Sequence, residues 1–365
     1  MKPNGIETRV SAKSYFFGPY VDFFLAGGFS ILMYFFISRN FSADGPPKML
    51  MTLAAGLLWV GNWPHFAATN LRLYGSLSTI RQYPLTATLV PVFILIGMVL
   101  SLMNPETVAP YFIKIFLLWS PYHFSGQTVG VTLIYARRAN FTLSYIERRA
   151  LSWFVFGTFL YATARSETFV GVHKYYDIAY PTFGLPLWVP ELIAPVMWFS
   201  AIIFFWAYLR ESFGRKQILP FIILVPCVAQ FVWFVAGSGV QGFYEFVPFF
   251  HSIQYLLVAA SMRVVEQSEI RKDSSKVLLS MGGWTLSIVC LGAILFYVLP
   301  RYIEYQFSIP LYLALGVSGA AVQIHHFFVD GVIWKLRRET VAQPLMVNAK
   351  EIFRSLSENS HSGDK

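Results

Sequence analysis

Charged residues are scarce in this chain, and their scarcity indicates which solvent it folds in. Lys, Arg, Asp and Glu make up 13% of the 365 residues, whereas about a quarter of the residues of a soluble domain are charged. Hydrophobic residues make up 56% and aromatic residues 18%. A chain with so little polar surface is not expected to fold in water, so its composition predicts an integral membrane protein.

Several signatures of soluble enzymes and secreted domains are also missing. The chain has two cysteines, Cys227 and Cys290, without CxxC spacing, which excludes a disulfide framework or a thiolate metal site. It contains no GxxxxGK[ST], HExxH or GxSxG segment, and no GxGxxG that follows a predicted strand. The sequence therefore gives no support for a nucleotide hydrolase, a zinc protease or a serine hydrolase.

Long apolar windows are what the chain has instead. They are about twenty residues long, the length that crosses a hydrocarbon core of roughly 30 Å, and they lack the alternation of barrel strands. The sequence therefore predicts an all-α polytopic membrane bundle in one domain, 1–338, followed by a polar and partly disordered cytoplasmic tail, 339–365. We expect ten spans: 20–37, 48–70, 84–103, 108–135, 150–166, 188–209, 217–237, 244–262, 277–299 and 308–334.

The distribution of Lys and Arg predicts the orientation of these spans. With both termini cytoplasmic, 22 of the 28 basic residues fall in inner segments, as the positive-inside rule requires. The net charge of +9 is then explained by topology and by contact with anionic lipid, and nucleic-acid binding is not expected. A multi-pass protein of a bacterial inner membrane fits this pattern.

Five of the seven histidines lie within predicted spans. They are His65, His123, His251 and the adjacent pair His325 and His326. The four spans that carry them run in the same direction, and a basic residue follows each histidine or pair within 7 to 14 residues. At 1.5 Å per residue this places them roughly 10–20 Å from the inner helix ends. We therefore expect the histidines to share one layer of the membrane.

Helical phase indicates which faces of the spans meet. On the last span, small and polar residues recur every three or four positions, a pattern typical of a face that packs on neighbouring helices. His326 lies on this stripe, whereas His325 lies about 100° away from it. The stripe consists of Gly316, Gly319, Gln323, His326 and Asp330.

A hydrogen-bonding side chain follows each histidine by one helical turn. At this spacing it could reach an imidazole of a neighbouring helix and fix its tautomer. These residues are Thr69, Gln127, Gln254 and Asp330.

Four converging imidazoles favour a transition metal, although three other interpretations remain. An ionisable side chain in lipid is costly and usually faces the interior, and imidazole suits iron, copper, zinc and nickel. We predict His65, His123, His251 and His326 as ligands. Thr69, Gln127, Gln254, Asp330 and His325 are candidates for further ligands or for groups that orient them. The alternatives are a haem, a histidine-lined proton path, and structural packing of polar groups.

An apolar chamber with a histidine-bound metal favours chemistry on a hydrophobic lipid or isoprenoid. Iron with dioxygen is our leading hypothesis, in an oxygenase, a desaturase or an oxidative cleavage enzyme, with an electron-donor protein as a further partner.

The histidine segments "YHFSGQ", "FHSIQYL" and "HHFFVDGVIWK" lie scattered among the spans, without HxxxH or HxxHH boxes. In this respect the chain resembles the Brp/Blh-type bacterial carotene dioxygenases, whose proposed site is histidine-bound iron. The resemblance covers architecture and histidine distribution but no motif, and beta-carotene as a substrate is not carried over.

A transporter is the second class of function that the sequence leaves open. A proline precedes a histidine by one to three residues in "NWPHF", "WSPYHF" and "FVPFFH", and broken helices are typical of permeation paths. The same prolines would also bend helices toward a common metal. The acidic residues of the predicted spans lie only near the span ends, so no carboxylate is placed to couple proton transport at the centre of the membrane. These acidic residues are Asp22, Glu191, Glu245 and Asp330.

Overall fold

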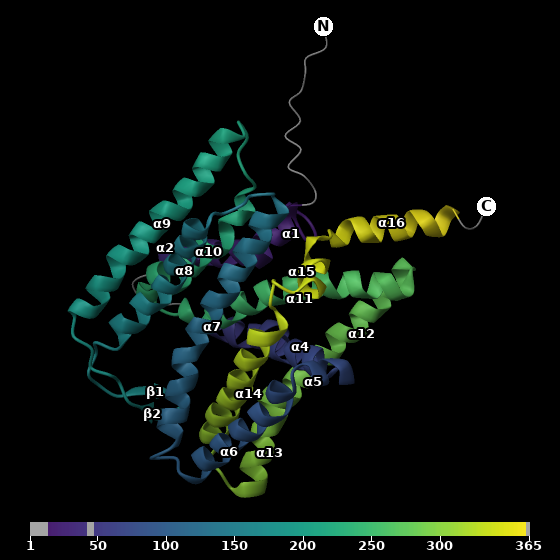
Figure 1. Ribbon diagram of the computed structural model, residues 1–365. Coiled ribbons are helices and arrows are strands. Elements are labelled where there is room, and N and C mark those ends of the chain that lie inside the picture. The colour runs from purple at the N-terminus through teal and green to yellow at the C-terminus, as the bar shows by residue number, and fades with distance from the viewer. Residues whose placement is uncertain (1–13, 42–46, 363–365) are drawn as a thin grey trace.

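The computed structural model describes residues 14–41 and 47–362, and within them nearly all regular structure is helical (Figure 1). The expected all-α architecture is thereby confirmed. The helices are α1 (Pro19–Phe23), α2 (Phe29–Asn40), α3 (Lys48–Leu57), α4 (Trp63–Tyr74), α5 (Leu77–Gln82), α6 (Val90–Met103), α7 (Ala109–Arg138), α8 (Tyr145–Ser166), α9 (Trp188–Gly214), α10 (Val225–Phe231), α11 (Val247–Arg271), α12 (Ser274–Ala293), α13 (Leu299–Phe307), α14 (Leu311–Ile333), α15 (Glu339–Ala342) and α16 (Ala349–Ser362). The antiparallel hairpin β1 (His173–Tyr175) and β2 (Ile178–Tyr180) lies in the long loop 167–187.

Wide π-helical turns connect several of these helices into longer elements. Three of the turns run directly into a helix with proline at its second position, namely Pro64, Pro91 and Pro300. Proline has no N–H to donate to the preceding turn and its ring crowds that turn, so a locally wider helix accommodates it. The described turns are η2 (Phe24–Gly28), η3 (Leu58–Asn62), η4 (Leu85–Leu89), η6 (Val232–Ala236) and η9 (Ile294–Val298), and short 3₁₀ turns are η5 (Phe221–Ile223), η7 (Gly237–Gly239), η8 (Tyr244–Phe246) and η10 (Pro344–Met346).

Five helical elements in the described ranges are long and apolar enough to cross a membrane. They coincide with five of the ten expected spans, and their surfaces expose large apolar side chains such as Leu95, Phe199 and Leu286, as lipid contact requires. The other expected spans are also helical, but α7, α8 and α11 carry more polar residues and 217–237 is broken into short helices. The five elements are Pro19–Asn40, Leu85–Met103, Trp188–Gly214, Ser274–Phe307 and Leu311–Ile333.

The four helices that carry the histidines of the expected spans form a closed ring. α14 contacts both α4 and α7, and α11 contacts the same two helices from the other side. α7 and α14 run side by side through the middle of the molecule (Figure 1). α12 braces α4 closely because Gly292 has no side chain: a Cβ there would lie 2.7 Å from the carbonyl carbon of Trp63. The ring therefore holds its inward faces at fixed positions.

The first and last described segments are tied to each other at the end of α7. The Arg138 guanidinium donates to the backbone carbonyls of Tyr15 and Leu345, and the Ala349 N–H donates to Phe16 O at 2.8 Å. Residues 339–349 therefore pack on the helical bundle instead of extending from it. The helix expected near 346–356 is present as α16 and continues to Ser362. Lys2, Arg9 and Lys13, which enter the predicted charge count, lie outside the described residues.

Asp22 organises the entry into the first span. Its carboxylate is fully buried and accepts from the backbone N–H groups of Phe16, Phe17 and Gly18 at 2.6, 3.0 and 3.1 Å, and from the Tyr135 hydroxyl at 3.0 Å. These backbone donors belong to the segment that leads into α1, and the carboxylate folds this segment back over the helix. One acidic side chain thus fixes the first helix against α7.

We expect Asp22→Ala to destabilise the fold, because it leaves several buried donors without an acceptor. An unpaired buried donor costs about 1–3 kcal/mol, so the thermal unfolding midpoint in detergent, followed by intrinsic fluorescence, should fall. Asp177→Asn is the control, since Asp177 lies in the exposed hairpin turn with a surface ion pair to Lys174, and asparagine tolerates its left-handed backbone. Equal midpoints for the two variants would contradict this role of Asp22.

Candidate metal centre

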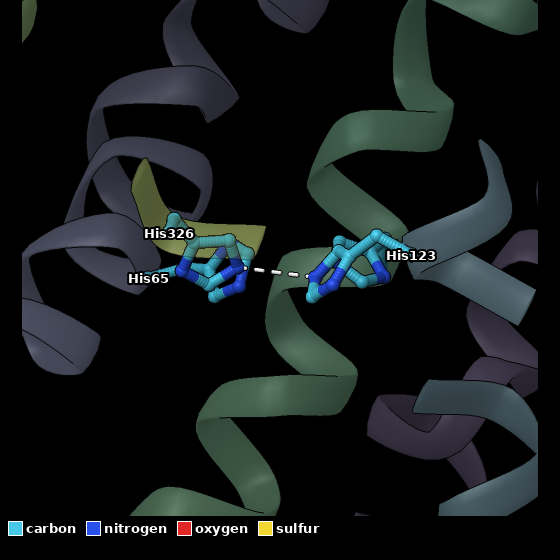
Figure 2. A group of neighbouring side chains, drawn as sticks. His65, His123 and His326 are labelled. Carbon is cyan, nitrogen blue, oxygen red and sulfur yellow. Dashed lines mark hydrogen bonds between the residues drawn. The ribbon is translucent and has the colours of Figure 1, made fainter. Parts of the chain in front are cut away.

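Four imidazoles, one from each helix of the ring, meet at one point. His65 of α4, His123 of α7, His251 of α11 and His326 of α14 each present a ring nitrogen, and these nitrogens all lie within 4.8 Å of one another. The Nε2 atoms of His123 and His326 are 3.1 Å apart. Figure 2 shows the rings of His65 and His326 facing that of His123. The predicted convergence of these four residues is confirmed.

The spacing of the four nitrogens suits a single ion. Nitrogen ligands at about 2.1 Å from one ion lie about 3.4 Å apart in a tetrahedron, so ring movements of about an ångström would bring these four to coordination distance. His65, His251 and His326 are almost completely buried, whereas 9% of the His123 side chain is exposed. The group is therefore shielded on three sides and reached from the side of His123.

The tautomer of His65 follows from its contact with Ser252. The Ser252 hydroxyl donates its one proton to Pro248 O at 2.6 Å, and the same oxygen lies 3.1 Å from His65 Nδ1. Because that proton is already used, Ser252 must accept, and Nδ1 of His65 must carry the imidazole proton. Nε2 of His65 then has a free lone pair, as in metal-binding histidines whose other nitrogen is held by a hydrogen bond.

Several buried nitrogens of the cluster have no hydrogen-bond partner among the described residues. They are Nε2 of His65, Nδ1 of His326 and both nitrogens of His251. A buried polar atom left without a partner costs about 1–3 kcal/mol, and native proteins rarely leave several together. A metal ion bound by one lone pair from each ring would compensate a large part of this cost. The donor set therefore fits a transition metal.

Asp330 is the one predicted accessory group that reaches the imidazoles directly. Its Oδ2 lies 3.3 Å from His326 Nε2 and 3.7 Å from His123 Nε2. Its Oδ1 accepts from the Thr69 hydroxyl at 3.0 Å, and that hydroxyl lies 2.6 Å from the hydroxyl of Tyr255. Thr69 consequently acts through Asp330 and not on an imidazole. The carboxylate can complete the coordination of an ion or hold the two rings.

Gln127 and Gln254 do not hydrogen-bond to an imidazole, which corrects the role expected from their spacing. The Gln127 amide donates to the backbone carbonyl of His251 and to the Gln254 side chain, both at 3.0 Å. Gln254 donates to Ala26 O in η2 at 2.8 Å. The π turn exposes this carbonyl, so the two glutamines join α7, α11 and the first span. They support the backbone that carries His251.

His325 points away from the cluster, as its phase on α14 predicts. Its Nε2 lies 3.1 Å from the Tyr74 hydroxyl, and the two rings are stacked with centroids 6.0 Å apart. The phase argument therefore identifies His326 correctly as the member of the pair that faces the ring of helices. His325 joins the outer face of α14 to the end of α4.

Three residues of the centre escape the sequence analysis. Ser252 orients His65, Tyr255 contacts Thr69 and the His65 ring, and Phe124 stacks on His251 with ring centroids 3.9 Å apart. Each lies one or four positions from a predicted ligand, and helical spacing from His251 could have suggested Ser252 and Tyr255. Aromatic residues are so frequent in this chain that Phe124 carries no such signal.

An apolar cavity of about 320 Å³ opens beside His123 and Asp330. It lies between α7, α11 and α14, within the range of small-molecule pockets. Aromatic and aliphatic side chains line most of it, and Gly126 and Gly130 of α7 leave open space there. An apolar molecule could therefore approach the histidines from this side.

No family model, curated protein or solved structure matches the chain at a significant level. The interpretation of the centre accordingly rests on its own residues.

We expect His326→Ala to abolish metal binding and His325→Phe to preserve it. His326 is fully buried in the cluster, whereas phenylalanine at 325 can keep the stacking on Tyr74 while losing one hydrogen bond. Metal content per protein, measured by inductively coupled plasma mass spectrometry after purification in detergent, separates the two variants. A metal-free His325→Phe variant beside a metal-loaded His326→Ala variant would overturn the assignment of the two faces.

We expect Asp330→Asn to weaken metal affinity about 10–100-fold, the usual effect of losing a group that orients ligands. Asparagine keeps the size of the side chain and can still accept from Thr69, but it removes the charge beside His123 and His326. Titration against a chelator of known affinity measures the change. Thr69→Val is the matched variant and should have a smaller effect, because the carboxylate remains. Unchanged affinity in Asp330→Asn would place the ion away from this carboxylate.

Proposed function

We propose that the protein is a membrane-embedded oxidoreductase with a histidine-bound transition metal, and that the metal is non-haem iron. The observation that carries this proposal is the convergence of four buried imidazoles whose ring nitrogens lie within 4.8 Å of one another. Neutral nitrogen ligands and one carboxylate are suited to iron, and calcium or magnesium would require more oxygen atoms.

The packing of the rings favours a bare ion over haem. The ring centroid of His326 lies 4.3 Å from that of His65 and 4.8 Å from that of His123. The ring centroid of His251 lies 5.1 Å from those of His65 and His123. A porphyrin held between two of these histidines would need a flat space much wider than these contacts leave. The four rings instead surround a volume of the size of one ion.

An iron ion held by these residues supplies the ability to activate dioxygen. Oxidative cleavage of a carbon–carbon double bond consumes one dioxygen, whose two oxygen atoms end in the two carbonyl products, and needs no other reductant. Hydroxylation or desaturation consumes one dioxygen with two electrons and two protons, so these reactions require an electron-donor protein. We therefore propose an oxygenase as the general class of enzyme. An electron-donor protein would be its partner in hydroxylation or desaturation.

The residues around the centre would exclude water and position an apolar substrate. Phe124 covers His251, and Phe327 stacks on His123 with ring centroids 4.8 Å apart. Because His123 and Asp330 line the apolar cavity, a hydrophobic molecule in this cavity would have its nearest carbon atoms beside the ligands. We propose a lipid-soluble substrate that enters from the bilayer.

We further propose that the chain crosses a bacterial inner membrane ten times with both termini in the cytoplasm. The distribution of basic residues supports this orientation. The C-terminal end of α7, which carries Arg137, and the C-terminal end of α14, which precedes Lys335, would then face the cytoplasm. The histidine centre would lie in the cytoplasmic half of the bilayer.

Stoichiometric iron in the purified protein is the test of this proposal. We expect one iron per chain by mass spectrometry of the metal, and a nitric oxide adduct with the electron paramagnetic resonance signal of high-spin non-haem iron. The same signal should be absent from His123→Ala and retained in His173→Ala, since His173 lies in the β1–β2 hairpin away from the centre.

Two other results would each replace the proposal. A haem absorption spectrum would assign a different cofactor to the cluster. A wild-type protein that holds no metal after purification and after anaerobic incubation with ferrous iron would favour a transporter or a histidine-lined path.

A further inference from the structure

The apolar cavity beside the histidines adjoins a second cavity that is basic. The second cavity has a volume of about 560 Å³ and shares Ile134 and Leu336 with the first. Three arginines line it, and no acidic residue appears among its described lining residues. These arginines are Arg137 at the end of α7, Arg148 at the start of α8 and Arg337 after α14. The two adjoining cavities, here termed the path, therefore extend from the arginines to the histidine centre.

One face of α7 forms the wall of this path along its whole length. His123, Gly130, Ile134 and Arg137 are spaced by seven, four and three residues, so they lie on the same side of the helix. From His123 to Ile134 the helix rises roughly 16 Å, and Arg137 lies one further turn away. The apolar part of the path is thus elongated, with the arginines at one end and His123 and Asp330 at the other.

Glycines keep this apolar part of the path open. A Cβ built on Gly126 or Gly130 has no atom within 4 Å apart from its own helix and chain neighbours, so the space above both residues is unfilled. Gly292, in contrast, permits close packing against Trp63. On α7 the missing side chains instead leave room for something that is not part of the chain.

The geometry points to an amphiphile with an anionic head and one apolar chain as the ligand of this path. The arginines would bind a carboxylate or a phosphate through charge-assisted hydrogen bonds, and the chain would lie along Gly126 and Gly130 with its far part beside His123 and Asp330. This assignment deepens the proposed function and rests on it for the reaction, since it places the reactive carbon atoms near the far end of the chain. Binding itself can be tested without any reaction.

Competition between matched amphiphiles tests the assignment. The purified protein in nanodiscs is titrated with cis-parinaric acid, whose fluorescence rises in an apolar site, and the probe is displaced with dodecyl phosphate, dodecanoate or dodecanol. We expect both anionic competitors to bind about tenfold more tightly than the alcohol, because three arginines would share the anion and charge-assisted hydrogen bonds are about twice as strong as neutral ones. The tighter of the two anions identifies the head group. Equal binding of all three competitors would overturn the assignment.

Paired variants distinguish the two parts of the path. The double variant Arg137→Gln/Arg337→Gln should lose the preference for anions, whereas Arg81→Gln, on the exposed surface of α5, should keep it. Gly130→Leu should weaken every competitor about tenfold or more, and Gly282→Leu, on the exposed face of α12, should not. The arginine variants change only exposed side chains, so they keep the test decisive if Gly130→Leu does not fold. An unchanged preference in the double variant would overturn the assignment.

Metal content, measured in the same samples, separates this inference from the proposed function. A protein that prefers anionic amphiphiles but binds no iron would refute the oxygenase and leave the ligand path intact. A protein that binds iron but does not distinguish dodecyl phosphate from dodecanol would refute the ligand path alone.

Discussion

Four imidazoles converge inside an apolar bundle, and the arrangement of the central helices follows from their burial. Burying ring nitrogens without hydrogen-bond partners costs free energy in a low-dielectric interior. Helices that bring such nitrogens together therefore need a shared ligand or stabilising contacts elsewhere in the fold. Each of the helices α4, α7, α11 and α14 contributes one imidazole to the cluster. Asp330 and Ser252 then fix the rings that could otherwise rotate.

Irregular helix geometry places these side chains. The π turn η3 ends immediately before Trp63, and Pro64 follows, so the α4 segment that carries His65 starts in a new phase. The turn η2 frees the Ala26 carbonyl for Gln254, which supports the α11 turn next to His251. Such turns are often found at functional sites because they redirect a side chain without ending the helix. In this protein the π turns direct the histidine-bearing faces of the helices toward the histidine cluster.

The segments at the two ends of the described chain complete the path to the centre. Leu345, next to the short helix α15, lines the apolar cavity and is held by Arg138 through its backbone carbonyl. Arg138 also binds the segment that leads into Asp22. The last turn of α7 consequently contacts the basic cavity, the first span and the C-terminal segment. The shape of the apolar cavity therefore depends on contacts far from the histidines.

Composition and helical periodicity were enough to predict an apolar environment, an all-helical class and the four inward histidines. Hydropathy and the 3.6-residue period are local properties, and a stripe such as Gly316 to Asp330 records them directly. The contacts between side chains, in contrast, appear only in the folded structure. It gave Asp330 two imidazoles, gave Gln127 and Gln254 backbone partners, brought Ser252 to His65, and joined Arg137 and Arg337 around one cavity. Helix rotation and π turns set these contacts, and both depend on packing between segments far apart in the chain.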